Sequence, residues 1–104
     1  MVSLTALKAS MAEVMGTPTV GGTFQFTVST TPTALGNRAV KMVTIKADKG
    51  NTDAVYIGFD SSVSSGNGFA LDPGESVDIV IDDLGKVYVV SGQDAQKIYV
   101  MWVA

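Results

Sequence analysis

The sequence predicts an all-β domain: a small antiparallel β-sandwich or barrel, jelly-roll-like, with an N-terminal arm. Short segments rich in Val, Ile, Thr and aromatic residues recur along the chain. Turns rich in glycine and aspartate separate them at intervals of about 8 to 12 residues, the spacing typical of sandwiches and barrels. No strong helical pattern follows residue 16. At 104 residues we expect one domain, and without cysteine it folds without disulfides.

Residues 1–22 differ in pattern from the rest and are expected to form an arm attached to a sandwich of residues 23–104. Apolar residues recur there at helical spacing, namely Leu4, Leu7, Met11, Val14 and Met15. The pattern fits a short helix between Ser3 as N-cap and Gly16 as stop signal, and an extended segment is the alternative. A helix this short is marginal in isolation, so the arm needs a surface to pack against.

Four segments alternate apolar and polar residues as half-buried strands do, and they are residues 23–30, 39–47, 53–59 and 75–82. In the first, Phe24, Phe26 and Val28 form the apolar face. The connections have turn chemistry, since Asp72-Pro73-Gly74 presets the backbone angles of a tight turn. Residues 60–68 are expected to form a polar loop whose one apolar side chain is Val63.

The last two predicted strands, residues 86–91 and 97–103, are apolar on both faces. In a sandwich of this size only one face of each sheet meets the core, so the second apolar face predicts an interface. The alternative is that the arm, or the loop of residues 60–71, folds over that face. The candidate interface residues are Tyr88, Val90, Tyr99, Met101, Val103, Leu4, Leu7 and Met11.

The charge composition is informative about partners. The net charge is −3 and no window gathers Lys and Arg, so nucleic acid is not an expected partner. Neither a signal peptide nor a membrane span is expected, which predicts synthesis in the cytoplasm. Only 16% of residues are charged while 46% are hydrophobic. Either Ser and Thr cover the surface, or part of it packs on copies of the chain or on another protein.

The residue types needed for most catalysis are missing. The chain has no histidine to act as a base for a serine nucleophile, and neither His nor Cys to bind zinc. Asp78 and Asp82 share a strand face at about 13 Å, too far apart for a glycosidase pair. Asp48 and Asp53 are expected to cap turns, with a weak calcium site as the alternative. We expect no enzyme, no cofactor and no metal site.

Exposed aromatic side chains are candidates for stacking on sugars. They are Tyr56, Tyr88, Tyr99 and Trp102. Trp102 alternates with Ile98 and Val100, which favours the core or an interface over a sugar platform.

The stretch VTIKADKGNTDAVYIGFD, with GFALDPGESVDIVIDDLGKVYVVSG and QKIYVMW after it, resembles a domain recurrent in virion proteins of tailed bacteriophages. The resemblance covers residues 43–103, and its most distinctive pieces are NTDAVYIG and LDPGES. Residues 1–40 carry no part of it.

The resemblance implies a structural β-sandwich, most concretely a capsid decoration (cement) protein on the outer surface of a phage head. Its implied partners are the major capsid protein and further copies of itself, with a trimer favoured over a dimer. Tail and fibre components are the alternatives that the resemblance leaves open. A module that binds carbohydrate or a host surface through the loop of residues 60–71 is a third hypothesis.

Overall fold

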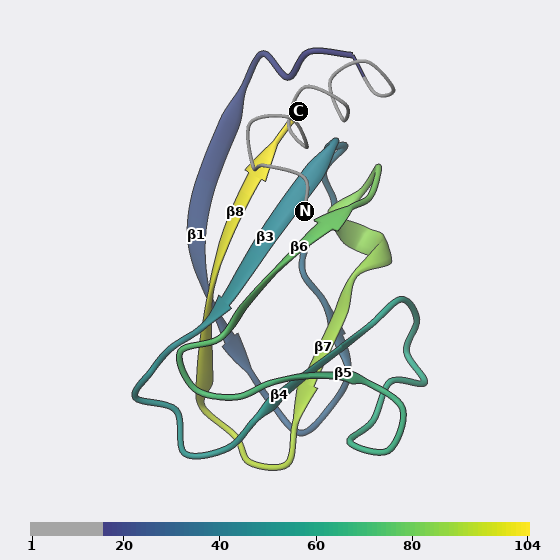
Figure 1. Ribbon diagram of the computed structural model, residues 1–104. Coiled ribbons are helices and arrows are strands. Elements are labelled where there is room, and N and C mark those ends of the chain that lie inside the picture. The colour runs from purple at the N-terminus through teal and green to yellow at the C-terminus, as the bar shows by residue number, and fades with distance from the viewer. Residues whose placement is uncertain (1–15) are drawn as a thin grey trace, which may run out of the picture.

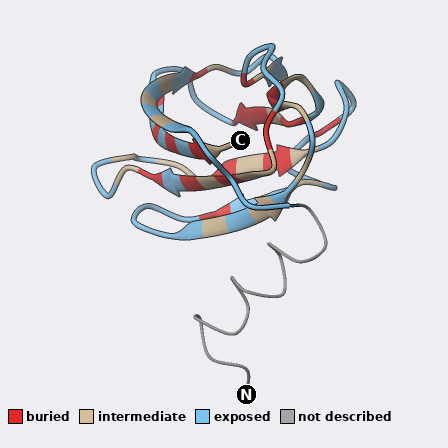
Figure 2. Ribbon diagram, turned by 90° about the horizontal axis from the view of Figure 1, so that it is seen from above, coloured by how far each residue is buried: buried red, intermediate tan, exposed pale blue. Residues whose placement is uncertain are grey.

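The computed structural model describes residues 16–104, so Leu4, Leu7 and Met11 of the predicted arm lie outside the described residues. The predicted all-β class is confirmed. Within residues 16–104, eight strands form two antiparallel four-stranded sheets, and one turn of 3-10 helix, η1 (Leu84–Lys86), precedes β7. The sheets pack face to face as a sandwich (Figures 1 and 2).

The first sheet, sheet A, has the strand order β1-β8-β3-β6. Its strands are β1 (Gly21–Val28), β8 (Gln96–Val103), β3 (Met42–Ala47) and β6 (Ser76–Val80). The second, sheet B, has the order β2-β7-β4-β5. Its strands are β2 (Thr33–Ala34), β7 (Tyr88–Ser91), β4 (Val55–Gly58) and β5 (Phe69–Leu71).

The core lies between the sheets and is built from the alternating residues that the sequence indicated. Along β8, Ile98, Val100 and Trp102 are buried while Lys97, Tyr99 and Met101 are exposed, so only one face of this strand meets the core. Figure 2 shows the same alternation along neighbouring strands. The fully buried side chains are Ile45, Leu71, Ile98, Val28, Val43, Val55, Val87, Val89 and Val100.

Strand β1 begins at Gly21, two residues before the predicted start at 23. Gly21 and Gly22 pair with Val103 and Trp102, and a Cβ on Gly22 would lie 2.7 Å from the Trp102 ring. The double glycine lets a strand pass close to a large indole. The strand boundary was therefore predicted too late.

The segment before β1 is attached to the end of sheet A. The backbone N–H groups of Thr19 and Val20 donate to the carbonyl of Ala104, at 2.7 and 3.1 Å. The Lys41 side chain donates to the carbonyl of Thr17 at 3.0 Å. Residues 17–20 thus lie beside the last residues of β8 and the start of β3.

Candidate interaction surface

The outer face of sheet A, turned away from the core, is the first candidate site. Directly paired residues on neighbouring antiparallel strands share a face, so the register places the outward side chains in rows across the sheet. The first row, at the end where β1 begins and β8 ends, is Gly21, Val103, Met42 and Val80. The second is Thr23, Met101, Thr44 and Asp78, and the third is Gln25, Tyr99, Lys46 and Ser76.

The rows divide the face into an apolar and a polar part. The first row carries no polar side chain, and Met101 and Tyr99 extend the apolar surface along β8. Val80, Met101 and Tyr99 are exposed by 52%, 53% and 45%. Val103 and Met42 are partly exposed. We call the first row together with Met101 and Tyr99 the apolar patch.

The other outward residues of sheet A are polar and partly bonded to one another. Thr44 donates its hydroxyl to the Asp78 carboxylate at 2.6 Å, across β3 and β6. The amide of Gln25 donates to the Tyr99 hydroxyl at 3.5 Å, which holds the ring against β1. A shallow hollow of about 500 Å³ lies beside Tyr99 and Met101. The polar groups of Thr44, Asp78 and Gln25 thus have hydrogen-bond partners within the chain. The apolar side chains of the patch form no such bonds, and they are exposed to water.

The structure places Tyr99, Met101 and Val103 together on the apolar patch. Tyr88 and Val90 lie elsewhere, on the outer face of sheet B, because Val90 pairs with Tyr56 and Tyr88 with Gly58. The predicted interface residues on the described part of the chain therefore do not form one surface. Trp102, one of the four candidates for stacking on sugars, is a core residue with 8% of its surface exposed.

The prediction that Val90 belongs to an interface with another chain is wrong, because Val90 is only 7% exposed within this one. The loop after β4 folds back over the outer face of sheet B and buries Val63 to 5% exposure. Val63 lies so close to β4 that a Cβ on Gly58 would come within 2.6 Å of its Cγ2 atom. The alternative considered for the second apolar face, coverage by the loop of residues 60–71, is thus what occurs on sheet B. Tyr88 keeps partial exposure.

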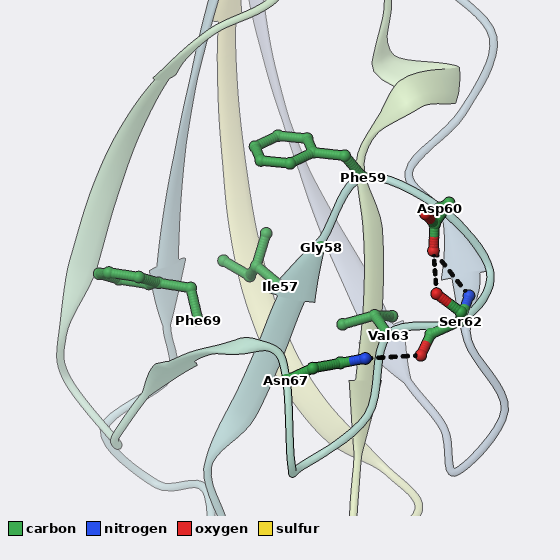
Figure 3. A pocket seen from close by; sticks show the side chains of 8 residues that line it. All are labelled: Ile57, Gly58, Phe59, Asp60, Ser62, Val63, Asn67 and Phe69. Atoms are coloured by element: carbon green, nitrogen blue, oxygen red, sulfur yellow. Dashed lines mark hydrogen bonds between the residues drawn. The ribbon is translucent and has the colours of Figure 1, made fainter.

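A second hollow, of about 370 Å³, lies at the mouth of the β4–β5 hairpin (Figure 3). The phenyl rings of Phe59 and Phe69 stand on either side of Ile57, and they are 62% and 61% exposed. Phe69 pairs with Ile57, so it continues the core-facing side of sheet B at its outermost strand, where the sandwich is open. The two rings form an exposed apolar pair that the loop does not cover.

The polar groups around this hollow are occupied in forming the loop. The Asp60 carboxylate accepts hydrogen bonds from the backbone and the hydroxyl of Ser62. Both hydrogen bonds lower the pKa of Asp60 below its ordinary 3.8, and the bond from the Ser62 hydroxyl has the larger effect. Asn67 accepts from the Ser64 N–H at 2.7 Å and donates to the Ser62 carbonyl at 3.1 Å. The hollow therefore offers a ligand its rings rather than free polar groups.

The aspartates hold turns, as expected from their positions. Asp48 accepts from the Gly50 N–H at 3.0 Å, and Asp53 from the Ala54 N–H at 2.8 Å. Asp82 forms an exposed ion pair with Lys86 at 2.8 Å, and the hydrogen bond from Lys86 lowers the pKa of Asp82. Within residues 16–104 no group of three or more acidic, His or Cys side chains converges as metal ligands would.

In the described part of the chain, no helix is long and apolar enough to cross a membrane.

Sequence reasoning missed Phe59, Phe69 and Val80 as exposed apolar residues. Phe59 and Val80 follow strand alternation, which assigns Phe59 to the core side and Val80 to the polar face. The signal for Phe59 is its position after the last paired residue of β4, Gly58, where the neighbouring strand no longer covers it. The signal for Val80 is that it is an apolar residue between Asp78 and Asp82 on the strand face that is otherwise polar.

Comparison of the sequence with models of protein families and with curated proteins gave no match. Three solved structures align with this chain at low identity. IMPa from Pseudomonas aeruginosa, solved in complex with an O-glycopeptide, aligns with a TM-score of 0.52 and 16% identity over 91% of this chain. The chain spans only 14% of the length of IMPa. At this identity the likeness shows a common fold and nothing further.

The other two solved structures are less similar in geometry. The Bacillus endospore appendage protein, from a family of disulfide-linked pili, has a TM-score of 0.46 and 14% identity, covering 81% of this chain and 85% of its own. YomS, a protein derived from the SPBc2 prophage, has a TM-score of 0.47 and 18% identity, covering 83% and 96%.

Proposed function

We propose that this chain is a non-enzymatic structural protein of a phage virion, and that it decorates the outer surface of the capsid. The observation that carries the proposal is the apolar patch, where Val80 and Met101 are each more than half exposed on a regular sheet. Solvent-exposed apolar residues gathered on one face are typical of surfaces that bind other proteins. The resemblance of residues 43–103 to virion domains of tailed phages supports the choice of partner.

The size of the patch suits attachment at many equivalent sites. The whole outer face of sheet A, three rows across four strands, spans roughly 14 by 14 Å at ordinary strand spacing, or about 200 Å² in projection, and the apolar patch is only a part of it. A stable two-protein interface buries about 800 Å² per partner, so the patch alone gives weak binding. Weak attachment is sufficient on a shell, because copies that also contact one another bind with far greater avidity than any single site provides.

Co-sedimentation with shells tests the proposal. The shells are assembled from the major capsid protein encoded by the same genome, in compact and expanded form, and mixed with the purified chain. We expect the chain to sediment with shells and Met101→Lys to bind about tenfold or more weakly, because burial of a Met side chain contributes about 1.5–3 kcal/mol. Phe69→Lys is the matched control: it changes an equally exposed apolar residue, 61% against 53%, away from the patch.

Two results would contradict the proposal. One is the absence of binding to either form of shell, with the chain remaining monomeric by light scattering. The other is an equal loss of binding in Met101→Lys and Phe69→Lys, because this would show that charge or stability, and not the patch, controls attachment. Sedimentation with tail tubes or fibres in place of shells would instead support the tail alternative.

The exposed ring pair favours a second candidate function, a module that binds carbohydrate. Rings in this position can stack on sugar faces, although the Asp60, Ser62 and Asn67 groups nearby are bonded within the loop. A glycan array with Phe59→Ala and Phe69→Ala as variants tests it. Binding that both variants abolish without loss of folding would support this function, and an empty array would remove it.

A further inference from the structure

Strand β1 forms one edge of sheet A, where only one of its two sides is paired (Figure 1). It pairs with β8 along its whole length, from Gly21 to Val28, and no strand within residues 16–104 pairs with its other side. The strand carries no charged residue and no proline, and its register with β8 contains no bulge. Exposed edge strands of this kind are templates for pairing with another chain.

The other sheet edges in the described part of the chain are shorter or carry charge. Strand β6, the opposite edge of sheet A, has Asp78 at its centre and begins three residues after Pro73. The edges of sheet B, β2 and β5, have two and three residues. Natural proteins protect sheet edges by short length, charge and proline. Among the edges formed by residues 16–104, β1 is therefore the one that lacks this protection.

The hydrogen bonds at the start of β1 show which of its backbone groups face the open edge. Val20 and Ala104 exchange both backbone hydrogen bonds, at 3.1 and 2.7 Å, so they form a hydrogen-bonded pair. Bonding to one neighbour alternates along an antiparallel strand, so every second residue from Val20 bonds to β8. In agreement, the carbonyl of Val103, opposite Gly21, accepts from the Lys41 N–H on the far side of β8. The residues of β1 whose N–H and C=O groups point away from β8 are Gly21, Thr23, Gln25 and Thr27.

We propose that β1 pairs antiparallel with β1 of a second copy of the chain, about a two-fold axis at Phe24. An isologous contact needs a self-complementary surface, and an uncharged edge brings no like charges together at the axis. With Phe24 opposite its own copy, Thr23 lies opposite Gln25 and Gly21 opposite Thr27, so every outward N–H and C=O has a partner. A register shifted by two residues would place one of them opposite Thr19 or Ser29, whose backbone groups bond to Ala104 and Ser91.

Two phenylalanine rings lie on the core side of this edge. Phe24 and Phe26 pack against the core and remain partly exposed at the outermost strand. In the pairing the two Phe24 rings meet across the axis, because pairs without hydrogen bonds bring their side chains closest together. One strand is a small contact compared with the about 800 Å² per partner of a standard interface, so we expect a dissociation constant in the micromolar range. The outer face of sheet A stays open, so the pairing does not depend on the proposed attachment to a capsid.

Sedimentation equilibrium of the purified chain, from low to high micromolar concentration, tests the pairing. The variant Thr23→Pro removes an outward N–H that bonds to nothing on β8, and Thr23→Ala, which retains the N–H, is the matched control. We expect Thr23→Pro to weaken the dimer about tenfold or more, because the two-fold axis removes the hydrogen bond twice. Thr23→Ala should change the dissociation constant by less than about threefold. Trp102 fluorescence shows whether each variant is folded.

Two double variants test the register without a proline. Thr23 and Gln25 both lie on the outer face of sheet A, and in the proposed register each faces the other across the axis. Thr23→Lys with Gln25→Lys then places like charges opposite each other, whereas Thr23→Lys with Gln25→Glu places opposite charges there. We expect the first double variant to dimerise about tenfold more weakly than the second, because the axis repeats the pair.

Four results would overturn the proposal. They are a parent chain that stays monomeric at high micromolar concentration, a trimer, a folded Thr23→Pro variant that dimerises as well as the parent, and equal dimerisation of the two double variants. A dimer that Met101→Lys abolishes and Thr23→Pro does not would place the contact on the apolar patch, which would also overturn it. If Thr23→Pro does not fold, the two double variants decide.

Discussion

The side chain of Gln96 connects the start of β8 to the loop between β3 and β4, and it allows a quantitative prediction. It is 4% exposed, and its carbonyl oxygen accepts hydrogen bonds from the backbone N–H groups of Thr52 at 2.8 Å and Asp53 at 3.0 Å. Its amide nitrogen donates to the Thr52 hydroxyl at 3.2 Å and to the Asp94 carbonyl at 3.3 Å. Gln96 is thus a buried polar residue whose side-chain oxygen and nitrogen are both hydrogen-bonded.

Replacing Gln96 by Ala should cost about 2–4 kcal/mol of unfolding free energy. The two backbone donors lose their acceptor while partly buried, and each such loss costs about 1–2 kcal/mol. The missing side chain adds a smaller penalty for lost packing. Against a stability of about 5–15 kcal/mol for a domain, this is a large fraction, and the midpoint of urea unfolding should fall by roughly 1–3 M.

Urea unfolding followed by fluorescence of the one tryptophan measures the effect, since Trp102 is in the core and becomes exposed on unfolding. Gln93→Ala is the matched control, because Gln93 is exposed in the same turn and its side chain accepts only from the Thr52 hydroxyl, at 3.1 Å. The control should change stability by less than about 0.5 kcal/mol. If Gln96→Ala behaved like the control, water would be replacing its carbonyl at no cost, and the reasoning on burial would be refuted.

Three further predictions concern turns and the loop over sheet B. Gly58→Ala should destabilise the fold by about 1–3 kcal/mol in the same urea assay, because its Cβ would lie 2.6 Å from Val63. Gly66→Ala is the control, since its Cβ would make an ordinary contact at 3.6 Å, and it should change stability by less than about 0.5 kcal/mol. Ala95→Gly should stabilise by about 0.5 kcal/mol, because relief of the left-handed φ of 64° outweighs the added chain entropy, and an unchanged or lower unfolding midpoint would contradict this. Ser62→Ala should raise the pKa of Asp60 toward 3.8 in an NMR titration, because the hydroxyl that hydrogen-bonds the carboxylate is removed. In the native chain, these hydrogen bonds stabilise the fold above the unfolded-state pKa of Asp60. That stabilisation is lost as the pH falls through the lower folded-state pKa.

Strand positions were predictable because alternation and turn chemistry are local properties. Segments 39–47, 53–59 and 75–82 contain β3, β4 and β6, and segment 86–91 contains β7. The last predicted strand, 97–103, matches β8 except that β8 begins one residue earlier, at Gln96. The short strands β2 and β5 were not predicted as strands, since two or three residues carry no alternation. The start of β1 was missed for a different reason: glycine is disfavoured in strands, and only the close approach of Trp102 explains Gly22 there.

The candidate site was partly predictable. Tyr99, Met101 and Val103 follow from the two-faced apolar pattern of β8, but that pattern is the same in β7, where Val90 on the second face is buried. The difference depends on a contact between Val63 and the strand surface near Gly58, across a polar loop that carries no strand pattern. A single valine in a serine- and glycine-rich loop is a weak signal, and its role is visible only once the loop is folded.

The two sheets present the same physical problem and differ in how the described chain resolves it. Each sheet has apolar residues on the side turned away from the core, and water contact with them is unfavourable by about 25 cal/mol per Å². On sheet B, Val63 covers the surface within residues 58–68, and the nearby glycines at 58 and 68 leave the room it needs. On sheet A, nothing within residues 16–104 covers Val80 or Met101. This difference is why we propose the open patch of sheet A, and not the outer face of sheet B, as the surface for contact with a partner.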